Sequence, residues 1–280
     1  MKSFLLFLAL CCVCVPVFAG EEEESGYERV MRTGILQCGY FSWPPYMWKN
    51  PASGEFDGFF YEYTETVVAR MGLKIDWVSE VVYGNIYQEI QSGKIDAFCS
   101  GIWPTAGLAK LLDFTIPITY NPVLAFVRAG DHRFDGDIIK LNDPAVKIAS
   151  MEGSIAGVIA ANRFQKAKLV ETPQLSGPSS QILDLATGKV DVAFIDWGLV
   201  DQYLSTNPEI KVEPVAGVRP LNVWGSTIAF GKGNDALVNA VNTVTQEMIY
   251  SGEIDDLLDR YHLDSKGFFR PLRPYSASQK

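Results

Sequence analysis

Asp196 is the side chain best placed to do chemistry, because it ends the apolar run Val190–Ile195 and is followed by Trp197. A carboxylate at the end of a buried strand costs free energy unless it lines a cleft or has a partner. Trp43-Pro44-Pro45-Tyr46 follows another apolar run, and its prolines fix an extended loop that can hold a large ring. A carboxylate and fixed aromatic rings at strand ends favour a small-molecule site, whereas simple packing is the alternative for the rings.

Gly153-Ser154 lies where a strand-like run gives way to a helical pattern. Free backbone N–H groups at the start of a helix can bind an anion, with the serine as the cap. Plain capping explains the same pair equally well. Both interpretations therefore stay open.

Other kinds of site have little support in the sequence. The only histidines, His132 and His262, are far apart and have no metal-ligand spacing around them. The serine-rich stretch 176–181 lacks the nucleophile-elbow pattern, and no glycine-rich phosphate loop follows a strand. We expect neither a metal nor a cofactor.

The elements that must position these residues alternate between short apolar runs and amphipathic stretches, which predicts an α/β fold with mostly parallel strands. The segments 91–103 and 186–198 have similar sequences, and each runs through Gly-Lys into a predicted strand that carries an aspartate. Two similar α/β units are implied. Strands are predicted at 33–39, 74–79, 95–102, 146–150, 168–171, 190–195 and 223–230; helices are predicted at 57–71, 85–92, 154–164, 180–187, 234–250 and 253–261.

The N-terminal residues are typical of an export signal, with Lys2, an apolar run and a small-residue cleavage pattern ending at Ala19. We expect residues 1–19 to be removed and residues 20–32 to form an acidic leader with little to bury. No later run is apolar over about eighteen residues, so no direct membrane anchor is expected. The formal net charge of −9 argues against nucleic acid as a partner.

Cys38 and Cys99 are the cysteines that remain after the predicted signal is removed. Each lies in an apolar, strand-like run. An oxidising compartment would permit a disulfide, and buried free thiols are the alternative. Neither arrangement suggests catalysis.

Seven short sequence motifs, in a fixed order along the chain, resemble those of a known family. They are GYFSWPPY (39–46), GEFDGFFYE (54–62), GKIDAFCSG (93–101), DFTIPI (113–118), MEGS (151–154), GKVDVAFID (188–196) and SGEIDDLLDRY (251–261). Together they resemble the family 3 extracellular solute-binding proteins, the receptors of polar amino-acid ABC importers, over residues 33–262.

The resemblance implies a two-lobed type II periplasmic-binding fold, in which each lobe is a mostly parallel sheet flanked by helices. Lobe one would comprise 33–126 plus 228–264, lobe two 127–227, and a surface extension 265–280. The chain would cross between lobes at 125–129 and 224–229. The protein would be a periplasmic monomer that closes over a small-molecule solute at the strand ends and delivers it to a membrane ABC permease.

The resemblance also implies that Trp43 and Tyr83 sandwich the ligand and that Asp196 holds its amino group. Gly101 lies near the end of the third predicted strand and Trp103 follows it, where the family places a Thr-x-Thr-x-x-Arg clamp for the ligand's carboxylate. Here the clamping threonine and arginine positions fall on Trp103 and Leu108, and no arginine occurs between Arg70 and Arg128.

Aromatic side chains take the place of the carboxylate clamp, and we expect Trp197 to lie near them. Rings around a carboxylate suit an organic cation and would also suit a flat, aromatic ligand. We therefore expect an amino-acid-like, cationic or aromatic metabolite rather than an ordinary amino acid held by a carboxylate clamp.

Two other functions fit the same scaffold. An exported cyclohexadienyl dehydratase would need a proton donor in the cleft, and Glu152 is the nearest candidate. A ligand-sensing receptor would need a separate membrane kinase as its partner. A binding protein without catalytic residues remains the primary expectation.

Overall fold

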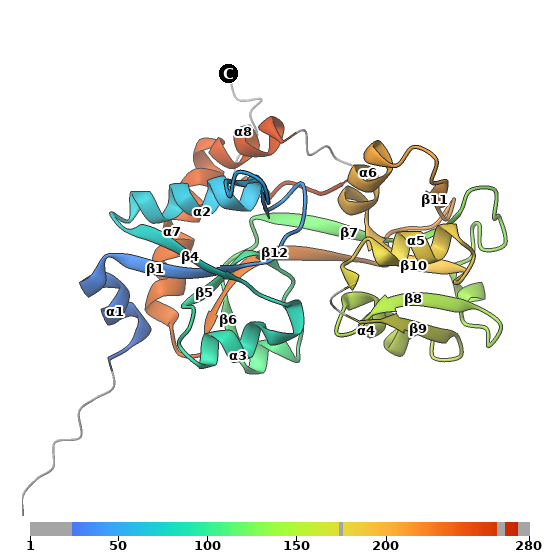
Figure 1. Cartoon of the computed structure of the whole chain (residues 1–280), viewed down its shortest axis with the longest axis horizontal. Coiled ribbons are helices and arrows are strands. Elements are labelled where there is room, and N and C mark those ends of the chain that lie inside the picture. Colours follow the sequence, from blue (N-terminus) through green and yellow to red (C-terminus); the bar gives the residue numbers. More distant parts are fainter. Residues whose placement is uncertain (1–23, 174–175, 262–266, 274–280) are drawn as a thin grey trace, which may run out of the picture.

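The computed structural model describes residues 24–173, 176–261 and 267–273, and these residues form two lobes joined by two long strands (Figure 1). The predicted signal, residues 1–19, lies outside the described residues. In the part of the chain that the structure describes, no helix is long and apolar enough to cross a membrane.

Lobe one contains a sheet in which β1 pairs in parallel with both β4 and β5, while β12 runs antiparallel to β5. Its helices bury apolar faces against this sheet. In α2, Phe60, Tyr63 and Val67 repeat at spacings of three and four residues and are at most 1% exposed, so they form the core face of the helix. The elements are α1 (Gly26–Thr33), β1 (Ile35–Tyr40), β2 (Trp48–Lys49), β3 (Phe56–Asp57), α2 (Phe59–Arg70), β4 (Lys74–Glu80), α3 (Ile86–Gln91), β5 (Ala97–Ile102), β6 (Leu112–Phe114), α7 (Asp235–Ser251) and α8 (Glu253–Arg260).

Lobe two repeats the arrangement, with β8 parallel to both β9 and β10. Its core gathers buried side chains from the sheet and the helices around it. Both lobes are thus built from mostly parallel strands flanked by helices, as predicted. The elements are β8 (Lys147–Met151), α4 (Ile155–Arg163), β9 (Lys168–Thr172), α5 (Ser180–Ala186), β10 (Val192–Asp196), α6 (Trp197–Thr206) and β11 (Val212–Pro214).

Two ten-residue strands, β7 (Thr119–Arg128) and β12 (Asn222–Gly231), run from one lobe into the other (Figure 1). Residues 119–123 pair with residues 222–226 in antiparallel register, and we call these paired segments the hinge strands. The first crossing therefore comes earlier than the predicted 125–129, because Ala125 already pairs with Phe194 of β10 in lobe two. The cause is that β7 continues as one unbroken strand into the second sheet.

The acidic leader and the C-terminal extension are more ordered than the sequence suggested. Helix α1 begins with a capping box between Ser25 and Glu28, and its Val30 is fully buried in the core of lobe one. Phe268 is 1% exposed in the same core, and Phe269 forms a backbone bridge with Tyr120 of β7. The surface extension expected from residue 265 onward is wrong for Phe268, because its side chain packs in the core of lobe one, whereas the side chain of Phe269 is 44% exposed.

Cys38 and Cys99 form a disulfide, with their Cα atoms 5.7 Å apart. They lie on the neighbouring strands β1 and β5, and both are fully buried. Of the two states left open by the sequence, the structure thus has the disulfide. The bond joins two neighbouring strands of the lobe-one sheet.

Candidate functional site

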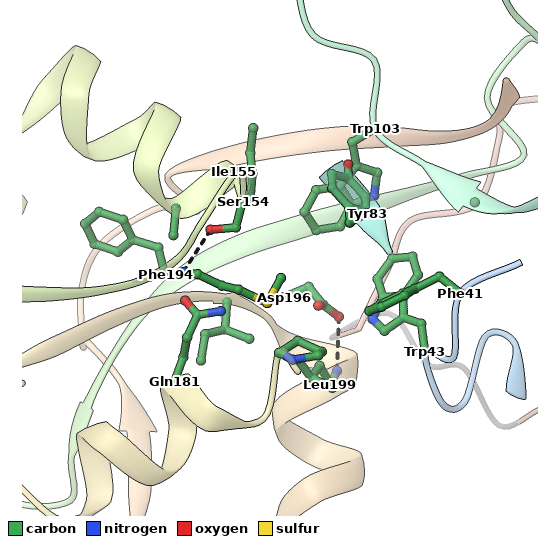
Figure 2. A pocket seen from close by; sticks show the side chains of 15 residues that line it. Phe41, Trp43, Tyr83, Trp103, Ser154, Ile155, Gln181, Phe194, Asp196 and Leu199 are labelled. Carbon is green, nitrogen blue, oxygen red and sulfur yellow. Dashed lines mark hydrogen bonds between the residues drawn. The ribbon is translucent and has the colours of Figure 1, made fainter. Parts of the chain in front are cut away.

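A cavity of about 100 Å³ lies between the lobes at the ends of their strands, and its size suits one small molecule (Figure 2). Lobe one contributes residues that follow β1 and β4 and residues at the end of β5. Lobe two contributes residues from β8, β10 and the starts of α4, α5 and α6. The predicted site residues among its lining are Trp43, Tyr83, Gly101, Trp103, Ser154 and Asp196.

The lobe-one wall is aromatic. The rings of Trp43 and Trp103 meet edge to face with centroids 5.6 Å apart. Trp43 also packs against a core cluster of lobe two, and Trp103 against another, so both rings reach across to the opposite lobe. Burial raises the pKa of Tyr83 to about 12, and its hydroxyl hydrogen-bonds to the backbone of Trp103. Tyr83 is therefore a neutral wall residue at physiological pH.

Gly101 shapes this wall through its backbone. Its φ of 85° lies in the left-handed region that favours glycine. A Cβ at this position would lie 2.4 Å from the Phe60 ring. Glycine is thus required both for the left-handed backbone near the end of β5 and for the close packing behind it.

Asp196 ends β10 and caps helix α6, since its Oδ1 accepts a hydrogen bond from the Leu199 N–H at 3.0 Å (Figure 2). Its side chain lines the cavity, and the residue is 4% exposed. Burial raises the pKa of Asp196 to about 6, while hydrogen bonds from the backbone of Leu199 and from the Tyr46 hydroxyl oppose the rise. The carboxylate is therefore charged at neutral pH without a cationic partner.

The start of α4 offers backbone donors to the cavity. Ser154 occupies the N-cap position, but its side chain makes no capping bond and instead accepts the Met151 N–H at 3.3 Å. Ile155 and Ala156, the first residues of this nine-residue helix, line the cavity. Their N–H groups have no side-chain cap and can donate hydrogen bonds to an acceptor atom of a ligand.

Three predicted or candidate residues do not line the cavity. Gly153 has a φ of 74° and turns the chain into α4. Trp197 packs on Phe126, with ring centroids 5.7 Å apart in the core of lobe two. Its ring turns away because Trp197 is the first residue of α6, whereas Asp196 before it still belongs to the strand. Glu152, the candidate acid of a dehydratase, is an exposed turn residue.

Sequence reasoning missed Phe41 and Gln181, which also line the cavity. Gln181 is 5% exposed, and its Oε1 atom is buried without a hydrogen-bond partner among the described residues. A signal for it exists in the sequence, because Gln181 adjoins the apolar face of α5 formed by Ile182 and Leu185. A polar side chain beside a buried helix face needs a partner.

The profile of the bacterial extracellular solute-binding proteins, family 3, matches residues 36–264, which is well over half of the chain. The chain belongs to this family. The resemblance inferred from the seven sequence motifs is thereby confirmed. This solute-binding protein carries its cavity where the two lobes face one another, and its fold is the expected type II periplasmic-binding fold.

Curated relatives are similar along most of their length. The L-cystine-binding protein TcyJ of Escherichia coli (strain K12) is 22% identical over 247 residues, which cover 85% of this chain and 86% of TcyJ. The arginine-binding extracellular protein ArtP of Bacillus subtilis (strain 168) is 22% identical over 274 residues, which cover 95% and 100%. Both relatives are binding proteins.

Solved structures share the fold. The ancestral amino acid-binding protein AncCDT-1, a precursor of cyclohexadienyl dehydratase, superposes with a TM-score of 0.72 at 22% identity, over 84% of this chain and 97% of that one. The substrate-binding protein AbpA from Streptococcus pneumoniae, bound to L-arginine, has a TM-score of 0.71 at 22% identity, over 84% and 97%. These likenesses concern the fold of this solute-binding protein.

No cluster of three or more histidine, cysteine, aspartate or glutamate side chains with metal-binding geometry occurs among the described residues. The chemistry of the cavity is instead that of an apolar, aromatic cleft with one carboxylate. It can bind a small molecule by stacking, by charge and by a few hydrogen bonds.

Proposed function

We propose that this solute-binding protein captures a small, amino-acid-like organic cation. The observation that carries the proposal is the charge of the cavity. Among the described residues that line it, Asp196 is the only charged side chain. A buried carboxylate with a raised pKa gains a partner when a cation enters, which gives the cavity an electrostatic preference for positive charge.

The aromatic wall supports the same ligand chemistry. The rings of Trp43, Tyr83 and Trp103 line the cavity on the lobe-one side of Asp196 (Figure 2). Aromatic faces attract organic cations, by about 0.5–2 kcal/mol for each contact. Cation–π attraction and Coulomb attraction would therefore act together on one ammonium or guanidinium group.

The cavity would recognise a carboxylate on the ligand only weakly. The clamping positions fall on Trp103, which bonds to Ser226, and on Leu108, which lies in a short 3-10 helix outside the cavity lining. The backbone N–H groups at the uncapped start of α4 can still donate hydrogen bonds to a carboxylate. We infer that a cation without a carboxylate binds nearly as well as its amino-acid counterpart.

Delivery to a membrane ABC permease is the role we propose for the captured solute. The family is that of extracellular solute-binding proteins, and one relative is named as an ABC transporter arginine-binding protein from Escherichia coli (strain K12). The expected export signal agrees with a periplasmic location. We propose that the protein works there as a monomer. The dehydratase alternative has less support, because its candidate acid, Glu152, does not line the cavity.

A calorimetric panel tests the proposal. The purified protein is titrated with agmatine, L-arginine, L-glutamine and L-glutamate at pH 7.5. We expect agmatine and L-arginine to bind with dissociation constants within about tenfold of each other, and L-glutamate not to bind. Tight binding of L-glutamine or L-glutamate alone would refute the cationic ligand.

A further inference from the structure

A chain of hydrogen bonds connects two walls of the cavity through the hinge strands. Trp103 Nε1 donates to Ser226 Oγ at 2.9 Å, and Ser226 Oγ donates to Asn121 Oδ1 at 2.8 Å. Asn121 Nδ2 donates to Tyr46 Oη at 3.0 Å, and the Tyr46 hydroxyl hydrogen-bonds to the Asp196 carboxylate. The chain thus begins at one lining residue and ends at another.

The direction of every bond in this chain is determined. An indole N–H can only donate, and an ionised carboxylate can only accept. Asn121 Oδ1 receives the hydroxyls of Ser226 and of Thr119, the latter at 3.2 Å, so the amide NH₂ group faces Tyr46. Because Tyr46 Oη accepts from Asn121, its single hydrogen is available to Asp196.

Burial makes these bonds difficult for water to replace. Tyr46, Asn121 and Ser226 are fully buried, and Asp196 is 4% exposed. In such surroundings a hydrogen bond is electrostatically stronger than in water, and a lost partner is costly. The orientation of the Tyr46 hydroxyl therefore depends on Asn121 rather than on solvent.

The chain also joins the two lobes. Tyr46 comes from the loop after β1 in lobe one, Asn121 lies on β7, and Asp196 ends β10 in lobe two. Tyr46 approaches the start of α6 so closely that a Cβ at Gly198 would lie 2.3 Å from its hydroxyl. Glycine at this position is what permits the contact between the lobes.

We propose that Tyr46 and Asn121 are positioning residues that keep the Asp196 carboxylate charged and oriented toward the ligand, although neither lines the cavity. This role adds to the proposed function, in which Asp196 binds the cation. Around Asp196, the described lining contains no lysine, arginine or histidine, and Tyr83 is its other titratable residue. From the side opposite the cavity, Tyr46 is the titratable group in contact, and the backbone N–H groups of Leu199, Asp196 and Gly198 also hydrogen-bond to the carboxylate.

An NMR titration of the ligand-free protein tests the proposal by following the Asp196 side-chain carboxyl carbon. In Tyr46→Phe the midpoint should rise by about one pH unit or more, because a donor to the charged form is lost. Asn121→Ala should raise it less, through the freed Tyr46 hydroxyl. The control is Tyr63→Phe, since Tyr63 is also fully buried and its hydroxyl bonds to Thr245 at 2.6 Å. An unchanged midpoint in Tyr46→Phe, or an equal rise in the control, would overturn the proposal.

A second measurement needs no substitution. In the unmodified protein, the Trp103 indole N–H and the Tyr46 hydroxyl proton should exchange slowly with D₂O, because both are held in the chain. Rapid exchange of the Tyr46 hydroxyl proton would overturn the proposal even if Tyr46→Phe failed to fold. Both measurements use the empty protein, so they remain decisive if the cationic ligand proves wrong.

Discussion

Asp196 accepts the Leu199 N–H at 3.0 Å, so the proposed anchor of the ligand is also the N-cap of helix α6. One side chain therefore serves the fold and the site together. The two roles can be separated, because asparagine can cap a helix but carries no charge.

Asp196→Asn should weaken the binding of agmatine at least tenfold while leaving α6 capped. The expected loss corresponds to a charged hydrogen bond, about 1.5–3 kcal/mol. Calorimetry gives the affinity, and circular dichroism checks the helix content. Asp196→Ala is the matched comparison, because it removes both roles and should have a free energy of unfolding about 1 kcal/mol lower than that of Asp196→Asn through the lost cap. Equal affinity in Asp196→Asn and the unmodified protein would contradict the anchor.

Because the pKa of Asp196 is raised, the free energy of unfolding should depend on pH. Its pKa is about 6 in the folded protein and near 3.8 when unperturbed, so the folded state binds more protons between these values. The contribution of Asp196 to the free energy of unfolding should therefore be most favourable below about pH 4 and fall until about pH 6. The total change is about 3 kcal/mol at 1.36 kcal/mol per pKa unit.

Urea unfolding of the unmodified protein and Asp196→Asn across pH 4 to 7 measures this contribution. The variant lacks the titrating group. As the pH rises from 4 to 6, the unfolding free energy of Asp196→Asn should therefore increase relative to that of the unmodified protein. A difference that stays constant with pH would show that the Asp196 pKa is not raised.

Gln181 allows a prediction in which affinity and stability move in opposite directions. Its Oε1 atom is buried without a partner in the described part of the empty protein, so Gln181→Met should raise the free energy of unfolding by about 1–3 kcal/mol. The same change should weaken binding if a ligand donor satisfies this oxygen. Gln202, exposed on α6, supplies the control Gln202→Met, which should alter neither quantity. A gain in stability with unchanged affinity would leave Gln181 without a role in the site.

The Cys38–Cys99 disulfide should stabilise lobe one without forming part of the site. It closes a segment of 61 residues, and replacing both cysteines by alanine should cost about 2–4 kcal/mol of unfolding free energy. Urea unfolding measures the loss. Because neither cysteine lines the cavity, agmatine affinity at low temperature should persist in the folded variant. An unchanged unfolding midpoint would contradict the stabilising role.

The alternation of apolar runs and amphipathic helices predicted most elements, because their core faces, such as Phe60, Tyr63 and Val67, repeat at helical spacing. Periodicity carries no information about which distant surface covers an element. The packing of Phe268 on lobe one was missed for that reason. The early first crossing was missed because β7 has no break where it passes between the lobes.

The candidate site could be predicted where strand ends locate it, as for Asp196 and Trp43. Trp197 was misplaced because one residue decides whether a side chain belongs to the strand end or to the first turn of α6. The hydrogen bonds of Tyr46 could not be predicted, since its partners Asn121 and Asp196 are separated from it by 75 and 150 positions in the sequence. Such long-range contacts depend on the register of two lobes, which local patterns do not specify.

Native mass spectrometry of the protein in an equimolar mixture of agmatine, L-arginine, L-glutamine and L-glutamate tests the cationic cleft most directly. Our account predicts bound masses for agmatine and L-arginine, both of which disappear in Asp196→Asn. A spectrum in which L-glutamate or L-glutamine is retained and agmatine is absent would contradict it.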